Sequence, residues 1–111
     1  MSNDGKFVNA VTGDLISPWH PMTDPRDLKA LGKLMEELAE CLAASARCVI
    51  QGLEESEPVT GKVNRHWLED EIADVKANIQ LVEQRFNLDR AIIKQRAERK
   101  YLNLQRWHTG A

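Results

Sequence analysis

The sequence predicts an all-α protein, a helical bundle of three main helices per chain that is completed by oligomerisation. Apolar residues recur at spacings of three and four along three stretches, which is typical of helices with one buried face. No strand pattern with two-residue hairpin turns is apparent. A single domain of 111 residues buries only about two-thirds of its unfolded surface, so self-association is expected.

The first predicted helix spans residues 25–51, after an irregular leader over residues 1–23 that contains several Gly and Pro residues. Asp24 is a good N-cap and Pro25 suits the first helical position. Gly52 follows as a C-terminal cap in the left-handed region. The apolar stripe of this helix consists of Leu28, Leu31, Leu34, Met35, Leu38, Leu42, Ser45 and Val49.

Two further helices follow a polar connection over residues 53–63. The second spans about 64–86, where the apolar spacing approaches a heptad repeat typical of a packed bundle helix. Asp89 caps the third, a basic helix that runs to about Gln105. The helical domain is therefore placed at 24–106, with a short tail over 107–111. The stripe of the second helix consists of Leu68, Ile72, Val75, Ile79, Val82 and Phe86.

The charge balance argues against several classes of partner. The chain has 15 Lys and Arg against 17 Asp and Glu, a net charge of −2, which gives no electrostatic case for a nucleic acid polymer or an anionic membrane. No stretch approaches the roughly 20 apolar residues of a membrane span. No signal-peptide pattern is present, and Cys41 and Cys48 are too far apart along one helix to form a disulfide. A cytoplasmic location is expected.

Two pairs of acids lie at helical spacing. Glu37 and Glu40 are three residues apart on the first helix, and Glu71 and Asp74 are three apart on the second. Each pair projects within about 60° on its helix, so two adjacent helices would bring four carboxylates together. Such an oxygen-rich site suits Mg²⁺ or Mn²⁺.

Acids on helices more often form solvated faces, so the surroundings of these residues matter. From Leu38 to Ile50 the first helix is apolar or small all round except for Glu40 and Arg47. A helix of this kind is normally buried, which predicts a buried Glu40 that needs a compensating partner. Arg47, two turns away, is expected to be too distant for direct contact, whereas a divalent cation would compensate several acids at once.

The pattern Glu36-Glu37-x-x-Glu40 followed by Glu71-x-x-Asp74 resembles the MazG-like all-α nucleoside triphosphate pyrophosphohydrolases, a group that includes dimeric dUTPases and dCTP pyrophosphatases. The resemblance covers residues 28–106. It implies that Glu37, Glu40, Glu71 and Asp74 ligate Mg²⁺, with Mn²⁺ as an alternative, and that Glu36 orients a water molecule. These five acids would form the catalytic set. The implied reaction cleaves nucleoside triphosphates to monophosphate and pyrophosphate.

Candidate substrate contacts lie outside the acid pairs. In the basic third helix, Lys100 is the first choice for phosphate because it falls beside the apolar stripe of Ile93, Ala97 and Leu104. Lys94, which falls beside Tyr101, is the second choice. Trp19, with His20, is a candidate to cover the nucleobase. Asn78 borders the acids of the second helix, and Asn103 lies one turn after Lys100.

The sequence also bears on two alternative functions. A non-catalytic helical oligomerisation or adaptor module would use the heptad of the second helix as its interface, with incidental acids. A di-iron carboxylate bundle requires Glu-x-x-His motifs, which the sequence lacks. The expected partners are therefore a nucleoside triphosphate substrate and further copies of the chain, in a homodimer or homotetramer.

Overall fold

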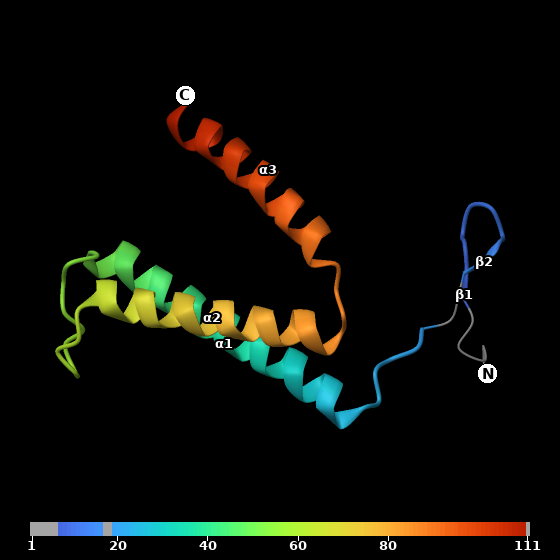
Figure 1. The fold of residues 1–111 in the computed structure, drawn as a ribbon, viewed down its shortest axis with the longest axis horizontal. Helices are drawn as coiled ribbons and strands as arrows, with labels where there is room; N and C mark the ends of the chain where they lie inside the picture. Colours follow the sequence, from blue (N-terminus) through green and yellow to red (C-terminus); the bar gives the residue numbers. More distant parts are fainter. Residues whose placement is uncertain (1–6, 17–18, 111) are drawn as a thin grey trace.

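The computed structural model describes residues 7–16 and 19–110, which form three helices and a small β-hairpin (Figure 1). The helices are α1 (Pro25–Gln51), α2 (Asn64–Arg85) and α3 (Arg90–Thr109). The all-α class and the three predicted helices are confirmed. The largest difference in the helix bounds is at the end of α3, which continues four residues beyond the expected Gln105.

The leader contains one element that its sequence does not predict. Strands β1 (Phe7–Val8) and β2 (Leu15–Ile16) pair antiparallel, so the leader is not wholly irregular. Asn9 shapes the connection, since its Oδ1 accepts hydrogen bonds from the backbone N–H groups of Val11 and Thr12 at 2.8 and 2.9 Å. The connection is longer than the two-residue turns that signal a hairpin in sequence, which explains the omission.

The predicted helix caps are present. The Asp24 carboxylate accepts a hydrogen bond from the Arg26 backbone N–H at 2.8 Å, and the Asp89 carboxylate accepts one from Ile92 at 3.0 Å. Gly52 ends α1 with a φ of 107° and donates its N–H to the Cys48 carbonyl. Its ψ of 142° lies outside the expected left-handed helical region, but the positive φ still favours glycine at this position.

Polar contacts at both ends fix α1 and α2 side by side and antiparallel (Figure 1). At one end the Arg85 guanidinium, at the end of α2, contacts the carboxylates of Asp27 at 2.7 Å and Asp24 at 3.2 Å. At the other end the fully buried Asn64 donates to the Gln51 side chain and the Gly52 carbonyl. These contacts set the register in which the middle turns of the two helices meet.

Helix α3 projects away from the α1–α2 pair (Figure 1). None of its residues is buried, and Trp107 near its end is 77% exposed. The α1–α2 pair also leaves much of its apolar surface exposed, with Leu42 at 72% and Val49 at 85%. Among the described residues, the buried hydrophobic side chains are those of Ala30, Ala44 and Val82. A single chain therefore buries only part of the predicted apolar stripes.

None of the three helices is both long enough and apolar enough to cross a lipid bilayer, within the part of the chain that the structure describes.

We expect the chain to be a homo-oligomer, because a lone chain leaves large apolar side chains on all three helices in water. Analytical ultracentrifugation at micromolar concentration should give a dimer or tetramer. Leu42→Lys, at a position that is already exposed in the single chain, should shift the distribution toward monomer. A folded parent chain that sediments as a monomer at every concentration would contradict this expectation.

Candidate metal centre

The middle turns of α1 and α2 bring three of the four predicted metal ligands together. One carboxylate oxygen from each of Glu37, Glu71 and Asp74 lies within 4.8 Å of the other two. Glu37 comes from α1, whereas Glu71 and Asp74 lie one turn apart on α2. The expectation that acids from two neighbouring helices converge is therefore met by these three residues.

Two of these carboxylates have an oxygen that is buried and unsatisfied. Glu37 is only 6% exposed, and its Oε2 and the Oε2 of Glu71 have no hydrogen-bond partner among the described residues. The Lys33 ammonium compensates one side of the cluster, because it lies 3.2 Å from Oε1 of Glu37. Buried carboxylate oxygens without donors are costly, and a hard divalent cation is the kind of group that satisfies several at once. The three residues thus fit Mg²⁺ or Mn²⁺.

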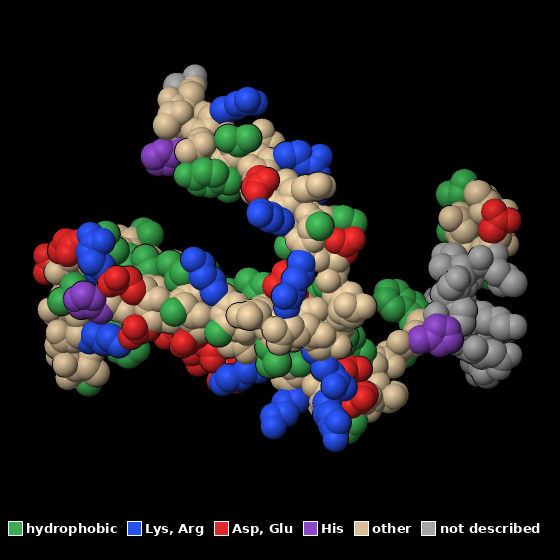
Figure 2. Space-filling view, in the orientation of Figure 1, with side chains coloured by type: hydrophobic (Ala, Val, Ile, Leu, Met, Phe, Trp, Pro, Cys, Tyr) green, Lys and Arg blue, Asp and Glu red, His purple; other side chains and the backbone are tan. Residues whose placement is uncertain are grey.

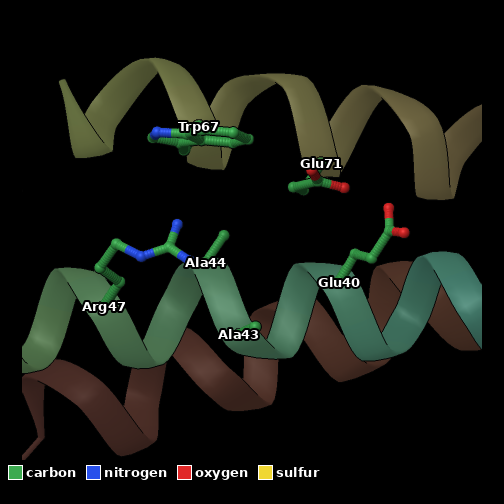
Figure 3. A pocket seen from close by; sticks show the side chains of 6 residues that line it. All are labelled: Glu40, Ala43, Ala44, Arg47, Trp67 and Glu71. Carbon is green, nitrogen blue, oxygen red and sulfur yellow. The ribbon is translucent and has the colours of Figure 1, made fainter. Parts of the chain in front are cut away.

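Glu40 does not have the predicted environment. Its side chain is exposed in the single chain, because neighbouring apolar residues such as Leu38 and Leu42 face solvent. The prediction of a buried Glu40 is wrong for the single chain, since α1 has only one partner helix. Glu40 nevertheless faces Glu71 across the space between the helices (Figure 3). The negative charge of Glu37, with partial desolvation by its neighbours and the charges of Glu71 and Glu36, raises the pKa of Glu40.

Glu36 lies beside the cluster and faces solvent. Its carboxylate pairs with Lys33 at 3.4 Å, and both side chains are about half exposed. The same ammonium therefore serves Glu36 and Glu37, which links the exposed acid to the buried one.

A pocket opens next to Glu40 and Glu71, further along the same two helices (Figure 3). Ala43 and Ala44 lie on its α1 side, and Arg47 and Trp67 form the end away from the acids. The guanidinium carbon of Arg47 lies 5.4 Å from the centroid of the Trp67 ring, a cation–π distance.

Neither Arg47 nor Trp67 is among the predicted site residues. A signal was available, because Arg47 follows Glu40 by seven residues and Trp67 precedes Glu71 by four. Both separations return a side chain to nearly the same helix face. Because α1 and α2 are antiparallel, a residue after Glu40 on α1 and a residue before Glu71 on α2 lie on the same side of the acids.

The candidate substrate residues are dispersed in the single chain. Asn78 donates its side-chain N–H to the Asp74 carbonyl at 2.8 Å, so it continues the α2 side of the site. Trp19 precedes α1 and is 78% exposed, and His20 beside it is also exposed. The remaining candidates, on the separate helix α3, are Lys94, Lys100 and Asn103.

Basic side chains gather on α3, whereas many acids lie on the α1–α2 pair (Figure 2). Lys100 and Asn103 line a shallow groove with Arg96 and Arg99. All four belong to α3, so this groove is separate from the acid cluster within one chain.

Comparisons of the chain with protein-family models, with curated proteins and with solved structures give no match.

We predict that Glu40→Gln stabilises the metal-free protein at neutral pH. The raised pKa means that the folded chain holds this proton more tightly than the unfolded chain does. Its ionisation therefore lowers the free energy of unfolding as the pH rises from the ordinary value of 4.5 through the raised pKa. Thermal unfolding in EDTA should show a higher Tm for the variant at neutral pH and no gain at a pH well below 4.5.

Glu83→Gln, which removes an acid from α2 outside the cluster, is the matched control for general charge effects. An equal Tm gain in both variants, or a gain at Glu40 that does not depend on pH, would contradict the electrostatic account.

Proposed function

We propose that the chain is a Mg²⁺-dependent nucleotide pyrophosphohydrolase of the MazG-like type, which cleaves ribo- or deoxynucleoside triphosphates to monophosphate and pyrophosphate. The observation that carries this proposal is the convergence of Glu37, Glu71 and Asp74 with two buried, unsatisfied carboxylate oxygens. The order and spacing of the acids, which resemble that family, support the same reaction. The enzyme is thus a hydrolase acting on acid anhydrides.

Glu37, Glu71 and Asp74 would hold the cation, and Glu40 would complete the set from the exposed rim. When bound, Mg²⁺ supplies an acidified water and positive charge for the phosphate oxygens. The Lys33 ammonium contacts the carboxylates of both Glu37 and Glu36 and so offsets part of their negative charge. Glu36, exposed and outside the cluster, is the acid proposed to orient the attacking water.

The exposed carboxylate of Glu40 suits metal binding at the rim of the cluster. In the metal-free chain the negative charge of Glu37 raises the pKa of Glu40. A bound cation would offset that repulsion between neighbouring carboxylates.

The basic helix α3 is proposed to supply substrate contacts within a homodimer or homotetramer. Lys100, Lys94 and Asn103 lie away from the acids of their own chain, and attraction between basic α3 and acidic α2 favours their approach in the assembly. Trp19 and Asn78 remain the candidates for contacts to the base and sugar. A cytoplasmic location, where nucleoside triphosphates are present with Mg²⁺, is part of the same proposal.

Glu71→Gln should lower nucleotide hydrolysis by about 100-fold or more, because it removes a proposed ligand, and residues that merely support ligands cost 10–100-fold. The measurement is pyrophosphate release from a panel of ribo- and deoxynucleoside triphosphates with Mg²⁺. Mg²⁺ should also raise the Tm of the parent and have less effect on the variant.

Glu69→Gln is the matched control, since Glu69 lies on the same helix and is exposed beside His66. It should retain parental activity. A Glu71→Gln protein with parental hydrolysis and an unaltered Mg²⁺ response would contradict the proposal and favour the alternative, a non-catalytic helical oligomerisation module.

A further inference from the structure

We propose that Arg47, held by Trp67, is an anion subsite that binds the phosphate chain of the substrate at the end of the pocket opposite the acids. This inference rests on the proposed function for the identity of the substrate, but its geometry is independent of the reaction. The subsite lies between α1 and α2 and requires no contribution from α3.

The pocket has two chemically different ends (Figure 3). Glu40 and Glu71 lie at one end, Arg47 and Trp67 at the other, and Ala43 and Ala44 lie between them on α1. The alanine side chains are short, so they leave the space between the two ends open. A ligand in this pocket therefore meets a place for a cation at one end and a fixed positive charge at the other.

The positive charge of Arg47 is available to a ligand. In the part of the chain that the structure describes, no carboxylate lies within ion-pair distance of its guanidinium, whereas Arg65 pairs with Glu54 and Arg85 pairs with Asp24 and Asp27. Arg47 is also partly buried, so water screens its charge less than that of a fully exposed arginine. The charge of Glu57 reaches Arg47 only from beyond ion-pair distance. The partly buried guanidinium, with no described carboxylate in contact, therefore favours an anion as its occupant.

Trp67 positions this arginine. The Arg47 guanidinium carbon lies 5.4 Å from the ring centroid, which restricts the side chain while leaving its N–H groups as donors. Lys62 also approaches the ring, at 4.3 Å, but its ammonium pairs with Asp70 at 2.5 Å. The Trp67 Nε1 is buried without an acceptor among the described residues and lies at the end of the ring that points away from Glu71 (Figure 3).

The separation of the two ends suits a polyphosphate rather than a single phosphate. Seven residues of α1 separate Glu40 from Arg47, or about 10 Å between their backbones at 1.5 Å per residue. Helical side chains lean toward the N-terminus, so the Arg47 and Glu40 side chains lean the same way along α1 and the separation of their charged groups stays of that order (Figure 3). A phosphate chain can therefore place one group at the acids and the next groups beside the guanidinium, where bidentate hydrogen bonds form.

The test is calorimetric titration of inorganic tripolyphosphate, with Mg²⁺ present, into the parent, Arg47→Gln, Arg47→Lys and Arg65→Gln proteins. Arg47→Gln should raise the Kd about tenfold or more, as expected for loss of charge-assisted hydrogen bonds. Arg47→Lys keeps the charge but not the planar fork, so its Kd should lie between those of the parent and Arg47→Gln. Arg65→Gln removes an exposed charge paired with Glu54 and should bind as the parent does.

A structural role for Arg47 in joining the helices predicts a different result. Arg47→Gln would then lower the Tm without changing the Kd of the folded protein for tripolyphosphate, and that outcome overturns the proposal. If Arg47→Gln does not fold, Arg47→Lys decides, since parental affinity in that variant also overturns it. A parent protein that does not bind tripolyphosphate overturns it directly.

Different results would reject the Arg47 subsite and the pyrophosphohydrolase proposal. Tripolyphosphate binding that depends on Arg47, in a parent that hydrolyses no nucleotide, would support the subsite and reject the pyrophosphohydrolase proposal. Hydrolysis that requires Glu71, with unchanged tripolyphosphate affinity and nucleotide KM in Arg47→Gln, would support the enzyme and reject the subsite.

Discussion

The antiparallel pairing of α1 with α2 is the constraint on which the rest of the structure depends. Arg85 fixes one end of the pair through Asp24 and Asp27, and buried Asn64 fixes the other through the end of α1. With both ends fixed, Glu37 meets the acids of α2, and like charges are held closer than they would otherwise lie. The contacts of Arg85 and Asn64 at the ends of the helix pair thus oppose the repulsion among the carboxylates at its centre.

This conflict between local charge and global packing is typical of functional sites. Lys33 neutralises part of the negative charge, but its contacts are with Glu36 and with Oε1 of Glu37, so the unsatisfied oxygens of the cluster remain. A divalent cation, as proposed, would resolve the conflict at the acid end, and a polyphosphate would complement both that cation and Arg47 at the other end. The same helix pairing therefore accounts for the proposed metal centre and the proposed anion subsite.

Local sequence signals were sufficient to predict much of the fold. Asp24 and Asp89 cap helices because their carboxylates satisfy N–H groups within the next few residues, and such contacts are readable from sequence. The acid pairs were found for the same reason, since helical spacing is local. The burial of Glu40 was misjudged because burial depends on partner helices, and the contact of Arg47 with Trp67 spans two helices. The position of α3 likewise depends on tertiary packing that its weak apolar stripe does not specify.

The central claim is that carboxylates of α1 and α2 form one divalent-cation site, and Mn²⁺ binding followed by electron paramagnetic resonance tests it most directly. Titration of the metal-free parent should reduce the sharp signal of free Mn²⁺, and excess Mg²⁺ should restore it by competition. The Glu37→Gln, Glu71→Gln double variant should leave the free signal unreduced, whereas the Glu69→Gln variant should behave as the parent. A parent that leaves all Mn²⁺ free at millimolar protein, or a double variant that binds it as tightly, would contradict the account.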